Sequence, residues 1–216
     1  MNIIEKNISV QKTARYFVLG EPSAQINSVL FVLHGYSQLA EDFIKFFEAV
    51  KNENVLIIAP EALNRFYIKG FSGKVGSAWM TKEDRENEIK DYINYLDSVY
   101  EDVINFGLPV KAKITVLGFS QGTAAVCRWI STGKSKANRL ILWGGGIPSD
   151  VDLESSKELF NSIRLTIVVG DKDEFISAKQ IKKEEERLRK NNIKYSLILF
   201  EGKHIIKREI LLKLFH

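Results

Sequence analysis

The chain has 216 residues, of which 31 are Lys or Arg and 27 are Asp or Glu, so its formal net charge is +4. Its length predicts a single domain over residues 1–216, with a sizeable core and little room for a second domain. Apolar runs are far shorter than the roughly 20 residues that cross a bilayer, and the basic residues are dispersed among acids. Neither a transmembrane segment nor a nucleic-acid partner is therefore expected.

Cysteine use and the start of the chain bear on its compartment. The single cysteine, Cys127, excludes an internal disulfide bond and is expected to be a buried residue of a helix. The first six residues show no charged start followed by a long apolar block, so no signal peptide is predicted. These features favour a cytoplasmic protein. Nothing in the sequence indicates an oligomeric state.

Apolar runs alternate with amphipathic segments along the chain. A hairpin over residues 5–19 is predicted to start the sheet. Almost wholly apolar strands, as expected where helices cover both faces, are predicted near residues 28–33, 54–59, 113–117, 139–143, 164–169 and 195–200. Helices are predicted near residues 39–51, 82–106, 121–132, 175–191 and 205–215. The alternation predicts an α/β fold with a mostly parallel central sheet and right-handed crossovers.

The segment 60–81 stands out among the predicted connections. It is long for a loop in a compact domain and rich in glycine and aromatic residues, including Phe71 and Trp79. Loops of that length are usually functional, which predicts a substrate-side loop; the other interpretation is that its aromatics cover the edge of the core. Thr81 is predicted to cap the helix that follows, because acidic residues occupy its first turn.

Gly118-Phe119-Ser120-Gln121-Gly122 follows directly on a predicted buried strand. A serine on a tight turn between a strand and a helix, with glycines two residues away on either side, is typical of an exposed nucleophile. The turn forces the serine into a strained backbone conformation, and side chains at the glycine positions would collide with the neighbouring strand and helix. The pattern predicts Ser120 as a catalytic nucleophile.

Such a serine needs a histidine and an acid, which follow it in chain order in this arrangement. Only His204 and His216 lie downstream of Ser120, and His216 is the last residue, where fraying disfavours a fixed geometry. His204, in a loop after a predicted strand, is therefore the expected base. In the loop after the preceding strand, Asp171 is expected to shape the turn, whereas Asp173 is placed to reach the histidine and is the predicted acid.

A tetrahedral intermediate also needs hydrogen-bond donors for its oxyanion, usually two backbone amides. The amide of Gln121 opens the helix after the serine, where the helix dipole favours negative charge. The second donor is expected in the loop that starts with His34 and Gly35 after an earlier strand. Tyr36 is the expected donor and Ser37 the next alternative, while His34 is expected to shape the loop through a ring hydrogen bond.

Taken together, the motifs resemble those of single-domain α/β-hydrolases of the small carboxylesterase, lysophospholipase and acyl-protein-thioesterase group. The segments that carry the resemblance are Leu33-His34-Gly35, Gly118-Phe119-Ser120-Gln121-Gly122-Thr123-Ala124-Ala125, Gly170-Asp171-Lys172-Asp173 and Gly202-Lys203-His204. The resemblance implies a serine esterase or thioesterase, with Asp173 as the second aspartate of a G-D-x-D motif. It also implies that Gly76-Ser77-Ala78-Trp79 borders the cleft, so Trp79, Phe71 and Tyr36 are the expected substrate contacts.

The predicted reaction is acyl transfer to water by way of an acyl-enzyme, with a small-molecule ester or thioester as substrate and neither a metal nor an organic cofactor. One alternative keeps the triad and makes the protein an acyl thioesterase or a lysophospholipase. An alternative of another class is a non-catalytic module that binds a small molecule on the same fold. A peptidase is less expected, because the chain has no room for the cap or propeller domain that peptidases of this fold generally carry.

Overall fold

A seven-stranded sheet in the order β1-β3-β2-β6-β7-β8-β9 forms the centre of this computed structural model, which describes residues 1–109 and 111–215. The strands are β1 (Tyr16–Leu19), β2 (Ser28–Leu33), β3 (Val55–Pro60), β6 (Lys113–Phe119), β7 (Arg139–Trp143), β8 (Arg164–Gly170) and β9 (Ser196–Phe200). β1 runs antiparallel to β3, and all the other neighbours in this sheet are parallel. The mostly parallel sheet predicted from the sequence is confirmed.

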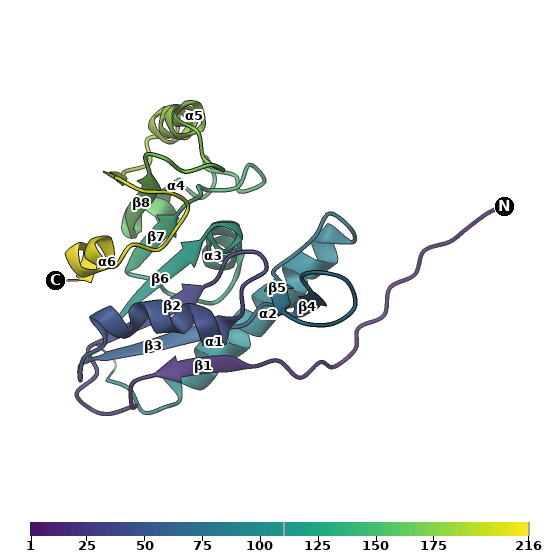
Figure 1. Cartoon of the computed structure of the whole chain (residues 1–216), viewed down its shortest axis with the longest axis horizontal. Helices are drawn as coiled ribbons and strands as arrows, with labels where there is room; N and C mark the ends of the chain where they lie inside the picture. Colours follow the sequence, from purple (N-terminus) through teal and green to yellow (C-terminus); the bar gives the residue numbers. More distant parts are fainter. Residues whose placement is uncertain (110, 216) are drawn as a thin grey trace.

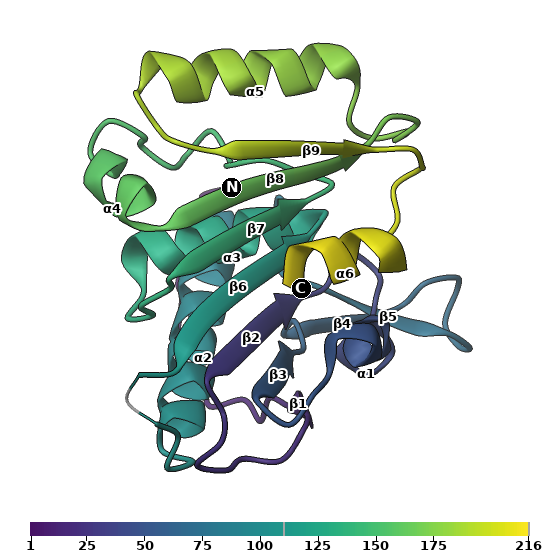
Figure 2. The same cartoon turned by 90° about the vertical axis from the view of Figure 1, so that its left-hand side faces the viewer.

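Helices cover both faces of the sheet, and Figure 2 shows α1 and α6 in front of it with α2 and α3 behind. The helices are α1 (Ala40–Phe43), its 3₁₀ continuation η1 (Ile44–Val50), α2 (Arg85–Ile104), α3 (Gln121–Thr132), α4 (Lys157–Ser162), α5 (Ala178–Lys190) and α6 (Arg208–Phe215). Alternate residues of β2 show why two layers form. Leu30 and Val32 belong to the core cluster with α1, η1 and α6, whereas Val29 and Phe31 belong to the cluster with α2 and α3.

The start of the chain differs from the prediction. Instead of a hairpin over residues 5–19, the described residues form only β1, which pairs with β3, and residues 1–15 lie in no strand. Ile3, Ile4 and Ile8 are strongly exposed, and the segment before β1 leads away from the sheet in Figure 1. Its apolar residues find no partner strand, so the residue pattern alone does not make a hairpin.

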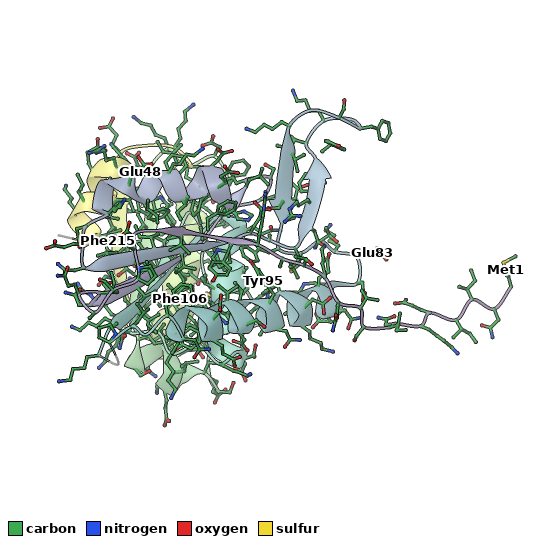
Figure 3. The ribbon with its side chains drawn as sticks, turned by 90° about the horizontal axis from the view of Figure 1, so that it is seen from below. Met1, Glu48, Glu83, Tyr95, Phe106 and Phe215 are labelled. Atoms are coloured by element: carbon green, nitrogen blue, oxygen red, sulfur yellow. The ribbon has the colours of Figure 1, made fainter. Side chains whose placement is uncertain are left out.

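The segment 60–81 also differs from the irregular loop that was expected. It contains β4 (Asn64–Tyr67) and β5 (Val75–Ala78), which pair as an antiparallel hairpin and project from the body of the molecule in Figure 3. Thr81 does not cap α2, because the helix begins at Arg85 after Asp84, which takes a left-handed conformation. The amide and hydroxyl of Thr81 bind the Glu88 carboxylate instead.

Helix α4 was not predicted, because its six residues are too few for a helical pattern to be visible. Cys127 is fully buried in α3, as predicted, and burial raises the pKa of its thiol. His216, the alternative that the sequence set aside as a base, lies outside the described residues.

Candidate active site

Ser120 lies on the turn between β6 and α3, at the carboxyl edge of the sheet. Its backbone angles are φ 53° and ψ −117°, a region that residues other than glycine rarely adopt. Hydrogen bonds hold this conformation on both sides. The Ser120 N–H donates to the Trp143 carbonyl (2.8 Å), and its carbonyl accepts the Thr123 N–H (3.0 Å) and hydroxyl (2.7 Å). Thr123 thus fixes the strained turn.

The flanking glycines are required because backbone packs directly on backbone at this turn. A Cβ on Gly118 would lie 2.4 Å from the Gly122 carbonyl oxygen, and one on Gly122 would lie 2.3 Å from the Leu33 carbonyl oxygen. Both distances are impossible contacts. The steric reason expected for this motif is therefore present at both positions.

Asp173 and His204 form a buried pair between the loops that follow β8 and β9. Asp173 Oδ2 lies 2.7 Å from His204 Nδ1, and the two side chains are 1% and 10% exposed. Asp173 Oδ1 accepts the N–H groups of Phe175 and Ile176, each at 2.9 Å. Asp171 plays a separate part: its Oδ1 accepts the Gly202 N–H (2.9 Å) and so ties the two loops together.

This pairing determines which ring nitrogen of His204 is available. Because Nδ1 donates to a carboxylate, neutral His204 carries its proton there and leaves Nε2 as an acceptor. His204 Nε2 is buried and has no hydrogen-bond partner among the described residues. An unpaired buried acceptor is costly in a folded protein and is a common sign of a functional group.

The His204 ring lies against the Ser120 turn. Its centroid is 4.9 Å from that of Phe119, the residue before the serine, and 4.8 Å from that of Phe175. A Cβ on Gly144, the residue after the carbonyl that the Ser120 amide binds, would come within 2.7 Å of the ring. No hydrogen bond joins the Ser120 hydroxyl to His204 in the described part of the chain. Such contacts often tighten only when substrate binds.

The two expected oxyanion donors in the loop after β2 differ in whether their N–H groups are already hydrogen-bonded. The Ser37 N–H donates to the Ser77 carbonyl (2.9 Å) and is therefore occupied. The N–H groups of Tyr36 and Gln121 have no acceptor among the residues that the structure describes. A Cβ on Gly35 would lie 3.2 Å from the Ser120 Cβ, so this loop passes directly beside the serine. The Tyr36 N–H, unlike that of Ser37, is therefore available, and its role as the second donor stays a prediction.

His34 supports this loop from the core, as expected. Its Nδ1–H donates to the Gly35 carbonyl (2.8 Å), and Nε2 accepts the Ala62 N–H (3.1 Å). The protons are assigned from these partners, because the Ala62 amide can only donate. Burial lowers the pKa of His34 to about 4, so the ring is neutral at pH 7 and acts as a fixed hydrogen-bonding group.

A sequence model of the family described as phospholipase/carboxylesterase matches residues 14–215. The chain belongs to this family. Membership supports a hydrolase that acts on carboxylic esters, which agrees with the resemblance found in the motifs. No protein among those with curated functions matches the sequence.

Solved structures show the same fold for this phospholipase/carboxylesterase family member. Acyl-protein thioesterase 2 from Zea mays is 17% identical, with a TM-score of 0.72 over 94% of this chain and 98% of that one. A carboxylesterase from Mesorhizobium loti is also 17% identical, with a TM-score of 0.72 over 94% and 92% of the two chains. Esterase PE8 is 20% identical, with a TM-score of 0.69 over 94% and 97%. Identities this low establish the α/β-hydrolase fold alone.

Trp79, an expected substrate contact in this family member, is 1% exposed. Its Nε1–H donates to the His34 carbonyl (2.8 Å), and its ring packs on the His34 and Tyr92 rings. The side chain of Gln121 accepts the Trp79 N–H (3.0 Å) and donates to the Met80 carbonyl (2.8 Å). Trp79 thus leaves no surface for a ligand and holds the Tyr36 loop from behind, which corrects the role expected for its side chain.

The other expected contacts remain accessible. Phe71 is 98% exposed, in the turn of the β4–β5 hairpin, and Tyr36 is half-exposed with its ring 5.2 Å from that of Phe66. Their contact with substrate stays a prediction. Phe175, which the sequence analysis did not single out, is exposed and packs on the His204 ring. The signal for it was an aromatic residue two positions after the predicted acid.

A mostly apolar cavity of about 290 Å³, whose wall also includes Glu184 and Glu185, lies next to residues that adjoin Ser120 and Asp173. Its wall includes Ala124, one helical turn after Ser120, and Ile176, whose amide binds Asp173. The sheet contributes Ile167 and Val169. This cavity has the character of a site for the apolar part of a ligand.

In residues 1–109 and 111–215, no three His, Cys, Asp or Glu side chains are grouped so as to hold a metal ion. Within the same residues, no helix has both the length and the apolar character needed to span a bilayer.

Proposed function

We propose that the protein is a serine hydrolase that cleaves carboxylic esters through Ser120, His204 and Asp173. The observation that carries the proposal is the buried Asp173–His204 pair, with 2.7 Å between Oδ2 and Nδ1. It leaves the buried Nε2 of His204 without a partner among the described residues, beside the strained Ser120 turn. An oriented imidazole next to a serine between strand and helix is the arrangement that activates a hydroxyl.

In the proposed mechanism, His204 Nε2 removes the hydroxyl proton as Ser120 Oγ attacks the ester carbonyl carbon. Asp173 keeps the imidazole in the required tautomer and stabilises its cation. The amides of Tyr36 and Gln121 bind the oxyanion of the tetrahedral intermediate. The intermediate collapses when His204 gives the proton to the leaving oxygen or sulfur, and the acyl group stays on Ser120.

Water completes the cycle. His204 Nε2 takes a proton from a water molecule that attacks the acyl-enzyme carbonyl, and a second tetrahedral intermediate forms at the same amides. Its collapse returns the proton to Ser120 Oγ and releases the carboxylic acid. All protons are exchanged between substrate, water and these side chains, so the scheme needs no cofactor.

The apolar cavity supports acyl esters as substrates. Ala124 brings its wall within one helical turn of Ser120, so an acyl chain attached to the serine has an apolar space nearby. This observation also supports the second candidate function, an acyl thioesterase or lysophospholipase, because both act on acyl chains. A ladder of acyl lengths, offered as matched oxygen esters and thioesters, separates these activities by their kcat/KM values.

The test is a comparison of Ser120→Ala with Ser98→Ala, which removes a hydroxyl from the exposed face of α2. A fluorophosphonate forms a bond from its phosphorus to an activated serine oxygen and loses fluoride. We expect it to label the wild type and Ser98→Ala but not Ser120→Ala, and turnover of a short-chain p-nitrophenyl ester to fall at least about 10³-fold in Ser120→Ala alone.

Two results would contradict the proposal. Retained ester hydrolysis in folded Ser120→Ala would show that another group carries the reaction. A wild type that neither labels nor turns over any ester of the ladder would favour the non-catalytic binding module. Circular dichroism and thermal unfolding of each variant establish that the fold is retained.

A further inference from the structure

At the sheet edge opposite Ser120, neighbouring strands begin with basic residues. Lys113 begins β6, Arg139 begins β7 and Arg164 begins β8. The parallel register places Arg139 directly beside Arg164, and beside Thr115 on its other side. These strands run away from this edge toward the carboxyl edge that holds Ser120. The register therefore gathers cations from three strands at one place remote from the proposed active site.

These residues line a cavity of about 740 Å³. Its size lies within the range of about 300–1,000 Å³ that is usual for small-molecule sites. Lys111 adds a fourth cation to the wall, and no described residue that lines the cavity is acidic. Neutral polar groups and the Phe215 ring complete the lining. A cavity with one sign of charge attracts ligands of the opposite sign.

Arg139 is held in place by two contacts, but not all of its hydrogen-bond donors have a partner among the described residues. One guanidinium nitrogen donates to the Leu214 carbonyl (2.7 Å), and the group stacks over the Phe215 ring, 5.3 Å from its centroid. Arg139 Nε is buried and has no hydrogen-bond partner in the described chain. Burial, and to a lesser extent Arg164, lowers the pKa of Arg139, but an arginine keeps its charge at neutral pH. Among the described residues, the cluster therefore holds positive charge with no acidic residue in the cavity wall, together with an unused buried donor.

We propose that this cavity is a second ligand site, which binds a compact anion that carries phosphate groups. Arginine forks and lysine ammonium groups are the donors that phosphate oxygens accept best. An anion here would neutralise the repulsion between Arg139 and Arg164 and supply acceptors for the cluster. Asn138 offers a neutral donor, because its Oδ1 is occupied by the Ile114 N–H (2.7 Å) and its side-chain amide N–H₂ group has no acceptor among the described residues.

The phosphate groups can come from an inorganic polyphosphate or from a nucleotide, and the experiment separates these sources. Isothermal titration with pyrophosphate, ADP and adenosine is carried out in chloride buffer at constant ionic strength. We expect saturable binding of pyrophosphate at one site per chain. Tighter binding of ADP than of pyrophosphate identifies a nucleotide site, equal binding identifies a phosphate site, and adenosine is expected not to bind.

The variant Lys113→Gln with Arg164→Gln removes two exposed cations that make no side-chain hydrogen bond among the described residues. We expect it to keep the fold and to bind pyrophosphate at least about tenfold more weakly, since each lost charge-assisted hydrogen bond is worth that factor. Lys179→Gln with Lys182→Gln on α5 removes the same charge elsewhere and should bind like the wild type.

Absence of saturable binding up to millimolar pyrophosphate would overturn the proposal. Equal weakening of pyrophosphate binding in both double variants would also overturn it, because that result would show only general charge attraction. Arg139→Gln gives a further check if its fold is intact, and it should weaken binding most. Ser120→Ala should bind pyrophosphate like the wild type, so the outcome is independent of the proposed hydrolase activity.

Discussion

Asp173 holds the His204 ring through one oxygen and its own loop through the other, so Asp173→Asn separates orientation from folding. The amide oxygen of asparagine can still accept the N–H groups of Phe175 and Ile176, now 2.9 Å from Oδ1. At the Oδ2 position, however, the new NH₂ group would face the Nδ1–H at 2.7 Å. Two donors cannot bond, so His204 is forced to carry its proton on Nε2 instead.

The magnitude follows from this change of tautomer. A ring protonated on Nε2 cannot take a proton from Ser120, and the negative charge that stabilises its cation is also gone. In a serine protease the equivalent change lowers kcat by about 10⁴, which corresponds to about 5 kcal/mol of activation free energy. We expect a loss of about 10³ to 10⁴ in kcat for the ester, with KM changed much less.

The assay is the initial rate of p-nitrophenyl ester hydrolysis, with thermal unfolding as a measure of fold. Asp171→Asn is the matched control, because the asparagine oxygen can still accept the Gly202 N–H that Asp171 Oδ1 accepts at 2.9 Å. It should keep activity within a few fold. Near wild-type turnover by Asp173→Asn, or an equal loss in Asp171→Asn, would refute the assignment of Asp173 as the acid.

Two further changes test the support of the oxyanion loop. Trp79→Phe removes the N–H that binds the His34 carbonyl but keeps an aromatic ring. It should lower the free energy of unfolding by about 1 kcal/mol. It should also lower kcat, because the loop that carries the Tyr36 amide loses a hydrogen bond that holds it in place. Trp129→Phe is the control, because it removes the Nε1–H donor to Asp97 (2.8 Å) and should lower stability by a similar amount while kcat stays unchanged. Equal kcat values in the two variants would show that the Trp79 hydrogen bond does not support the oxyanion loop. The pKa of His34 is about 4 in the folded protein and near 6.5 in the unfolded chain. Between these two pH values the unfolded chain binds a proton that the folded protein does not. The free energy of unfolding should therefore fall by about 3 kcal/mol as the pH drops from about 6.5 to about 4. Urea unfolding at pH 7, 5 and 4 measures the slope, and His34→Gln should flatten it; an unchanged slope would exclude His34 as its cause.

Much of the fold could be predicted because local patterns were strong and agreed with each other. The strands 28–33 and 139–143 and the helix 121–132 occur within the predicted bounds, since long apolar runs and turn residues mark them. The predicted hairpin over residues 5–19 failed because a strand needs a partner, and only β1 finds one. Helix α4 and the β4–β5 hairpin were missed because such short elements depend on their neighbours more than on their own sequence.

The proposed site likewise has features that the sequence predicts and features that only the structure shows. The G-x-S-x-G motif required a strained serine between glycines, because any Cβ at those positions meets backbone atoms. The sequence already made Tyr36 the expected donor and Ser37 the alternative. Only the structure shows that the Ser37 N–H is bound to the Ser77 carbonyl, forty residues away. The buried position of Trp79 also needed the structure, because an aromatic residue near a cleft can line it or support it.

The sequence by itself determined the alternation of strands and helices, the family and the candidate residues of the proposed site, because these depend on local periodicity and on steric demands within a few residues. Tertiary structure alone decided which amides stay free, which aromatic ring is buried, and which cations meet at the far edge of the sheet. The physical reason is that hydrogen-bond partners, burial and strand register arise from segments distant in the chain. No local pattern contains the distance between such segments.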